Sequence, residues 1–80
     1  MMTVFHGAHR IDIQVWGKEK VFYDGHQVTG KWSMWGATHV FQVNEDGEAT
    51  TYEVEIGSRW HGWAAWVQVR RNGIMIFTNR

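Results

Sequence analysis

Residues 64–78, with the sequence AAWVQVRRNGIMIFT, decide the fold class. The first half of this stretch alternates valine with polar residues, which is the period of a strand with one face in a core. Asn72-Gly73 follows, and this pair readily accepts the positive φ angles of a two-residue type I′ turn. The apolar run after the turn is the expected return strand. The stretch therefore predicts an antiparallel hairpin in which Arg71 lies opposite Ile74.

The same signature recurs along the chain. Asp24-Gly25 and Asp46-Gly47 also separate alternating apolar runs. Turn signals recur about every 8–12 residues, a spacing typical of a sandwich or small barrel. We expect a single all-β domain over residues 1–80, a small antiparallel sandwich or barrel of about six to eight short strands joined by tight hairpins. A loop or single turn, not a helix, is expected between Arg59 and Trp66, because Gly62 interrupts that segment. The expected strands lie at about 9–16, 19–23, 26–34, 38–44, 49–56, 64–71 and 74–78.

A chain of 80 residues is near the size at which a core becomes marginal. It contains no cysteine, so neither disulfides nor thiolate zinc sites reinforce it, and this composition suits a reducing compartment. Six Trp, four Phe and two Tyr supply the apolar bulk instead. The amino terminus lacks the features of a secretory signal, and we expect a cytoplasmic protein.

Charge excludes some classes of partner. Eight basic residues balance eight acidic ones, so no overall field favours nucleic acid or an anionic membrane, and neither is an expected partner. The two signs are nevertheless separated along the chain, because acids gather in 45–55 and arginines in 59–80. Cross-strand pairing between the acidic and the basic strands is the simplest interpretation.

The residue types of an active site do not converge in the sequence. The five histidines are His6, His9, His26, His39 and His61. They lack metal-ligand spacing, so we expect neither a metal nor another cofactor, and His39 alternates with apolar neighbours on a face that should be buried. Neither Ser33 nor Ser58 lies in a nucleophile elbow. Glu45, Asp46 and Glu48 are expected on an exposed turn, where burial cannot raise a carboxyl pKa. We therefore expect no catalytic residues and no enzyme.

Tryptophan is concentrated in one segment. Residues 60–66 read WHGWAAW, with three indoles in seven residues. Trp66 begins an alternating strand and is expected to pack. Trp60 and Trp63 flank a glycine in the expected loop, next to Arg59, whose guanidinium can stack on aromatic rings. Binding hot spots are enriched in Trp and Arg. The predicted partner-binding residues are Trp60, Trp63, Arg59, His61 and Trp35.

The amino-terminal half resembles a known family. Residues 7–13 (GAHRIDI), then Gly17-Lys18 leading to Tyr23-Asp24-Gly25, then 31–34 (KWSM), are similar to the G-x-H-K-I-x-F, G-K-x-x-V-x-x-D-G and tryptophan motifs of the Fas apoptosis inhibitory molecule family. Residues 51–56 and 67–73 can be laid on its closing strands. The resemblance implies a sandwich-like β domain without enzymatic activity that works through protein contacts. The family carries two such domains and has no counterpart of residues 60–66, so its apoptotic role is not transferred.

Three hypotheses for function remain. The first is a non-enzymatic protein-interaction module that uses an aromatic surface. The second is a module that binds a carbohydrate or other small molecule on Trp60, Trp63 and Trp35. The third is a small enzyme with a site of histidine and carboxylate. A protein partner is expected, and a homodimer is a further option, because a short sheet with edge strands can complete itself by dimerising.

Overall fold

The computed structural model describes residues 1–15, 18–32, 36–59 and 64–80. These residues form strands joined by turns, with no helix among them. The strands are β1 (Met2–His6), β2 (His9–Gln14), β3 (Lys18–Tyr23), β4 (His26–Trp32), β5 (Gly36–Glu45), β6 (Glu48–Arg59), β7 (Ala64–Arg71) and β8 (Ile74–Thr78).

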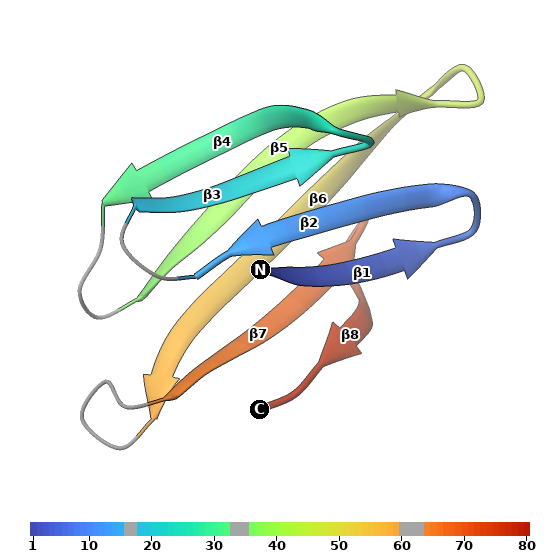
Figure 1. The fold of residues 1–80 in the computed structure, drawn as a ribbon. Coiled ribbons are helices and arrows are strands. Elements are labelled where there is room, and N and C mark those ends of the chain that lie inside the picture. The colour runs from blue at the N-terminus through green and yellow to red at the C-terminus, as the bar shows by residue number, and fades with distance from the viewer. Residues whose placement is uncertain (16–17, 33–35, 60–63) are drawn as a thin grey trace.

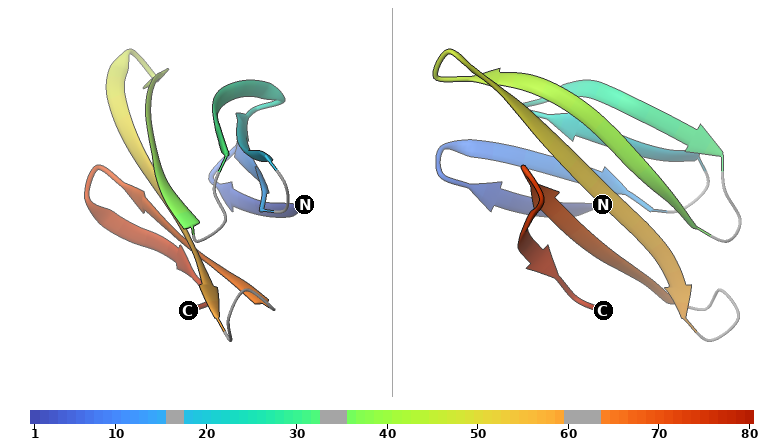
Figure 2. Two further views of the ribbon diagram at one scale, coloured as in Figure 1. Left: turned by 90° about the vertical axis from the view of Figure 1, so that its left-hand side faces the viewer. Right: turned by 180° about the vertical axis from the view of Figure 1, so that it is seen from behind.

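The strands make two antiparallel sheets that lie face to face (Figures 1 and 2). One sheet has the order β1-β2-β3-β4 and the other the order β5-β6-β7-β8, so each sheet is a simple meander of consecutive strands. We call them the N-terminal and the C-terminal sheet. The predicted all-β antiparallel fold of about six to eight short strands joined by tight hairpins is confirmed, in its sandwich form.

The three Asx-Gly pairs form turns of the predicted kind. The Asx residues Asp24, Asp46 and Asn72 have φ of 47°, 53° and 50°, and the glycines that follow them have φ of 86°, 85° and 82°. Positive φ at both central positions is the mark of a type I′ turn, whose twist matches that of the flanking strands. Arg71 pairs with Ile74, as the sequence predicted.

The sequence prediction missed β1. Its residues Met2–His6 pair with β2 from Met2↔Ile13 to His6↔His9, and Gly7, with φ of 59°, begins the turn between them. Val4 is buried in the core, whereas the side chain of Phe5 points outward and is largely exposed. Apolar residues on both faces remove the period-two signal, so this strand had no pattern by which to be recognised.

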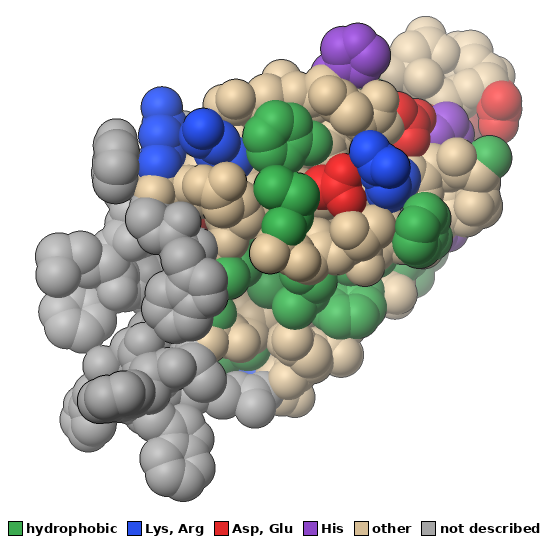
Figure 3. All heavy atoms as spheres, in the orientation of Figure 1, with side chains coloured by type: hydrophobic (Ala, Val, Ile, Leu, Met, Phe, Trp, Pro, Cys, Tyr) green, Lys and Arg blue, Asp and Glu red, His purple; other side chains and the backbone are tan. Residues whose placement is uncertain are grey.

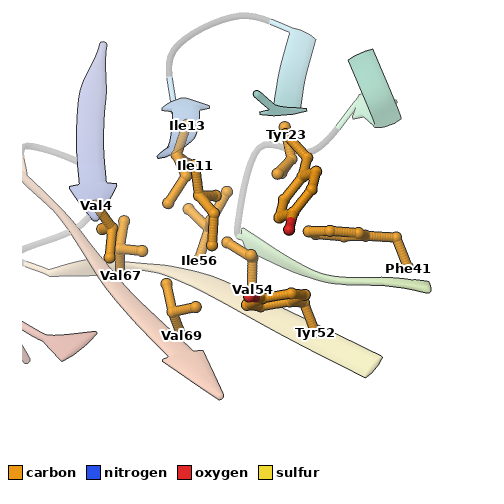
Figure 4. Packing of buried hydrophobic residues seen from close by; sticks show 11 residues of the cluster. Val4, Ile11, Ile13, Tyr23, Phe41, Tyr52, Val54, Ile56, Val67 and Val69 are labelled. Carbon is orange, nitrogen blue, oxygen red and sulfur yellow. The ribbon is translucent and has the colours of Figure 1, made fainter. Parts of the chain in front are cut away.

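The core lies between the sheets and is built from the alternating positions of the strands. Each strand presents one set of residues inward because successive side chains point to opposite faces. Figure 4 shows Val4 of β1 beside Val67 of β7, while Tyr23 of β3 approaches Phe41 of β5 and Tyr52 of β6. The buried apolar residues are Val4, Ile11, Ile13, Val21, Tyr23, Phe41, Tyr52, Val54, Ile56, Val67 and Val69.

Trp66 packs, as expected, but on the outer face of its sheet. Its neighbour Val67 points into the core, so Trp66 points outward and is half-buried. It pairs with Gly57 of β6, and the Arg80 guanidinium lies over the indole, 4.6 Å from the ring centroid. A Cβ added to Gly57 would lie 2.1 Å from the Trp66 ring. The indole therefore occupies the space that the missing side chain leaves.

This contact makes Gly57 sensitive to substitution. We expect Gly57→Ala to lower the free energy of unfolding by about 1–3 kcal/mol, the usual cost of an overpacked site, because the indole must move. The measurement is chemical denaturation of Gly57→Ala, Trp66→Ala and the double variant. In the Trp66→Ala background the clash is gone, so the cost of the methyl group should largely disappear. Equal costs in both backgrounds would show that the indole does not lie on Gly57.

Candidate functional site

Most of the binding residues predicted from the sequence lie outside the described residues. Trp35, Trp60, His61 and Trp63 are among them, so their role stays a prediction. Arg59 is the last residue of β6 and pairs with Ala64. The described strand ends that flank residues 16–17, 33–35 and 60–63 lie at the end of the sandwich opposite the Asx-Gly turns (Figure 1).

Glu45 is buried, which corrects the expectation that it lies on an exposed turn. It is the last residue of β5 and is 5% exposed. The Tyr23 and Tyr52 hydroxyls both donate to its Oε2, each at 2.5 Å. Arg71 donates to Oε1 from Nε at 3.0 Å and from Nη2 at 2.8 Å. The period of β5 turns Glu45 to the same side as Phe41, so the strand's last inward position carries a carboxylate.

The carboxylate of Glu45 stays ionised because its partners outweigh its burial. Burial alone would raise the pKa of Glu45, but hydrogen bonds from Tyr23, Tyr52 and Arg71 lower it to about 2. Burial and the adjacent carboxylate raise the pKa of Tyr52 to about 12, and the same two causes raise that of Tyr23. Both phenols are therefore donors at neutral pH. We call Glu45, Tyr23, Tyr52 and Arg71 the Glu45 cluster.

His9 connects the Glu45 cluster with the surface. Its ring stacks on Tyr23 with centroids 5.3 Å apart, and its Nδ1 lies 2.8 Å from Oδ2 of Asp24. The other oxygen of Asp24 accepts the Arg10 N–H at 2.8 Å. The hydrogen bond with Asp24 raises the pKa of His9, and the same bond lowers that of Asp24. His9 is thus biased toward its charged form beside the cluster.

A second buried polar cluster holds the middle of β5. His39 is fully buried, as its alternation with apolar neighbours predicted. Its Nε2 lies 3.1 Å from Oε1 of the buried Glu19 on β3, and its Nδ1 lies 3.2 Å from Oγ1 of Thr29 on β4. We call these three residues the His39 cluster. Every side-chain nitrogen and oxygen that is buried in the described part of the chain has a hydrogen-bond partner.

Both clusters therefore anchor β5 from its inner side. Glu45 ties the end of β5 to the N-terminal sheet through Tyr23, and His39 ties its middle to the same sheet through Glu19. The outer side of β5 is different, because Thr38, Val40, Gln42 and Asn44 are all exposed. Val40 is 57% exposed at the centre of the strand.

The backbone of β5 is hydrogen-bonded on one edge. The Thr51 C=O accepts a hydrogen bond from the Asn72 N–H at 2.7 Å, and the Thr51 N–H donates to Asn72 Oδ1 at 2.9 Å. Both Thr51 groups therefore point toward β7 and away from Gln42, the residue opposite Thr51 on β5. In an antiparallel ladder such non-hydrogen-bonded positions alternate along the strand. The N–H and C=O groups of Val40, Gln42 and Asn44 therefore point away from β6. In the described ranges no strand pairs with β5 on that side. We call this side, from Val40 to Asn44, the β5 edge.

The other three edge strands carry features that discourage further pairing. β1 and β8 have five residues each. β4 and β8 contain register shifts, which leave Val28 and Ile76 without a direct partner and twist the edge. β5 has ten residues in unbroken register with β6 from Gly36↔Gly57 to Glu45↔Glu48. Among the edges that the structure describes, β5 is therefore the best template for an added strand.

Charges are mixed on the outer faces. On the C-terminal sheet, Glu53 pairs with Val40 on one side and with Arg70 on the other. On the N-terminal sheet, apolar and charged side chains are interspersed (Figure 3), and Arg10 Nε lies 2.9 Å from Asp12 Oδ2. The expected pairing of the acidic segment with the basic one occurs between Arg71 and Glu45.

Comparisons of the chain with protein-family models, curated proteins and solved structures find no match. The resemblance to the Fas apoptosis inhibitory molecule family therefore stays a prediction. Within the described ranges, no three His, Cys, Asp or Glu residues are grouped in a way that could hold a metal ion. No helix of these residues is long and apolar enough to cross a membrane.

The Glu45 cluster is open to a direct test. We expect Tyr52→Phe to lower the free energy of unfolding by about 1.5–3 kcal/mol, because it removes a hydrogen bond to a buried charge. Denaturation of the variant in the wild-type and the Glu45→Gln backgrounds measures the coupling. The cost should shrink in the Glu45→Gln background, where the acceptor is no longer charged. An unchanged cost would mean that the phenol does not act through Glu45.

The same cluster predicts how stability depends on pH. The pKa of Glu45 is lowered on folding, so its contribution is present above the unfolded value near 4.5 and is lost as pH falls toward 2. This pKa shift corresponds to a contribution to the free energy of unfolding on the order of 3 kcal/mol. We expect the difference in unfolding free energy between wild type and Glu45→Gln to fall over this range in denaturation series at successive pH values. A difference that does not vary with pH would contradict it.

Proposed function

We propose that this domain is a non-enzymatic protein-binding module that takes up an extended segment of a partner as an additional strand on the β5 edge. A strand added there bonds to the N–H and C=O groups of Val40, Gln42 and Asn44, and the side chains beside the edge select its sequence. We also propose that it acts in the cytoplasm, which the absence of cysteine supports.

The observation that carries the proposal is the contrast between β5 and the other edges. Proteins normally protect an edge strand by making it short, bulged or charged. β1, β4 and β8 follow this rule, whereas β5 is long and regular and carries no Asp, Glu, Lys or Arg from Gly36 to Asn44. An unprotected edge is a liability for solubility, so its retention is best explained by a partner that pairs with it.

The two buried clusters support binding over catalysis. Glu45, His39 and Glu19 are the kinds of group that perform acid–base chemistry, but their contacts are with other side chains of the fold. They hold β5 in place from behind, so the edge is already ordered before a partner arrives. An ordered edge lowers the entropic cost of binding, because only the partner segment has to become ordered.

The charges beside the β5 edge indicate what the partner segment carries. Glu53 and Glu55 of β6 are the direct neighbours of Val40 and Thr38 on the outer face. A segment with uncharged or basic side chains on its outward positions fits this face, whereas an acidic segment is repelled. The rest of the partner is proposed to contact the residues predicted from the sequence, namely Trp60, Trp63, Trp35, Arg59 and His61.

Peptide selection tests the proposal without a known partner. The probe is a displayed library of random peptides of about ten residues, selected on the immobilised domain. We expect Val40→Lys to weaken the binding of the selected peptides at least about tenfold, because a charged side chain at this position disfavours strand pairing at the edge. Gln68→Lys is the matched control, since it places the same charge on the same outer face but on the central strand β7.

Hydrogen exchange gives an independent readout. Binding should protect the amide hydrogens of Val40 and Gln42, which point away from β6 in the free domain. If both lysine variants weaken binding equally, or if neither does, the β5 edge is not the site. Loss of binding in Trp60→Ala with full binding in Val40→Lys would assign the function to the aromatic segment.

A further inference from the structure

We infer that the strand received by the β5 edge is β5 of a second copy of this chain, so that the domain forms a symmetric dimer through a continuous eight-stranded sheet. This inference rests on the proposed function and names its occupant. The pairing is antiparallel, with Val40 opposite Gln42 of the second copy and the two-fold axis at Phe41. The outward-pointing backbone groups of Val40 and Gln42 in each copy then form the central hydrogen bonds.

The side chains of β5 are compatible with their own copies in this register. On the outer face Val40 meets Gln42, and neither residue is charged, so no like charges lie opposite each other. On the inner face Phe41 meets its copy at a non-hydrogen-bonded position, where side chains lie closest. Phe41 already stacks on Tyr52 with centroids 5.2 Å apart, so the dimer joins two aromatic clusters at the axis.

Electrostatics permits the copies to approach. The chain has a formal net charge of +0 and a pI near 7.0, and a protein without net charge has little long-range repulsion from its own copies. The acid nearest the axis on the outer face is Glu53, one strand inward from β5. Glu53 and its copy would lie about three strand spacings apart, roughly 14 Å, which exceeds the Debye length at physiological salt.

The small size of the domain favours self-association. A chain of 80 residues without cysteine has neither disulfides nor a large core to stabilise it. Joining two copies along β5 covers the longest unpaired edge that the structure describes and shields Val40, one of its most exposed apolar side chains. Oligomerisation is a common way for small domains to gain this burial.

The test measures mass and contact together. Sedimentation equilibrium from about 1 µM to 1 mM should show a mass approaching twice 9.4 kDa, and Val40→Lys should return it to the monomer at every concentration. Gln68→Lys should still dimerise. Ile74→Lys, on the exposed apolar edge β8, should also still dimerise, because β8 is not the interface.

Cysteine cross-linking then locates the interface, which the cysteine-free chain makes simple. Val40 and its copy are diagonal neighbours in the proposed register, about 7–8 Å apart, so a short bis-maleimide should link Val40→Cys into a covalent dimer. Gln68→Cys, five strand spacings from its copy, should not be linked.

The outcomes separate this inference from the proposed function. A monomer at all concentrations, or a dimer lost in Ile74→Lys but kept in Val40→Lys, overturns the second copy as occupant. If the monomer still binds selected peptides in a manner that depends on Val40, the proposed function stands and its occupant is another protein. If neither dimerisation nor peptide binding depends on Val40, both fail.

Discussion

The arrangement of the two sheets depends on the hydrogen bonds that the carboxylate of Glu45 accepts. It accepts hydrogen bonds from β3, β6 and β7 while belonging to β5, so one buried charge joins both sheets. Burying a charge is costly, and an apolar cluster of equal volume often gives as much stability. What the charge adds is uniqueness of register. A one-residue slip of β5 would turn Glu45 outward and leave Arg71 and two phenols without their acceptor.

The two halves of the chain share the same turn and edge geometry. Asp24 N–H donates to Arg10 C=O at 2.8 Å and its carboxylate accepts the Arg10 N–H, and Asn72 makes the same two bonds to Thr51. In both halves the register shift falls two residues after the first residue of the last strand, at Val28 and at Ile76. Each Asx residue thus caps its neighbouring strand before the bulge twists the edge away from further pairing.

This correspondence explains how the Glu45 cluster is assembled. Tyr23 and Arg71 hold equivalent positions, each immediately before the Asx residue of its own sheet. Because the sheets face each other, these two side chains approach from opposite layers, and both donate to Glu45. The turns and the alternation that place them are visible in the sequence. Their convergence is not, because it depends on how two separate meanders stack.

The sequence therefore predicts local structure better than the site. The Asx-Gly turns and the burial of His39 follow from local chemistry, since positive φ and period-two alternation leave direct traces in the residue order. The burial of Glu45 leaves none. It lies beside Asp46 and Glu48 in an acidic run, and only its place on the inward side of β5, counted from Phe41, distinguishes it. Trp66 was similarly ambiguous, since packing on Gly57 requires knowledge of strand pairing.

The β5 edge is the part of the molecule in which these constraints meet. On its inner side His39 and Glu45 hold the strand at two points six residues apart, which limits its freedom to twist away or fray. The pKa of Glu45 near 2 keeps this anchor charged at any physiological pH, so the edge is presented constantly and not switched by Glu45. A loosely held strand would lose part of its binding energy in becoming ordered. Folding has already ordered β5, so the addition of a strand at this edge would not incur that loss.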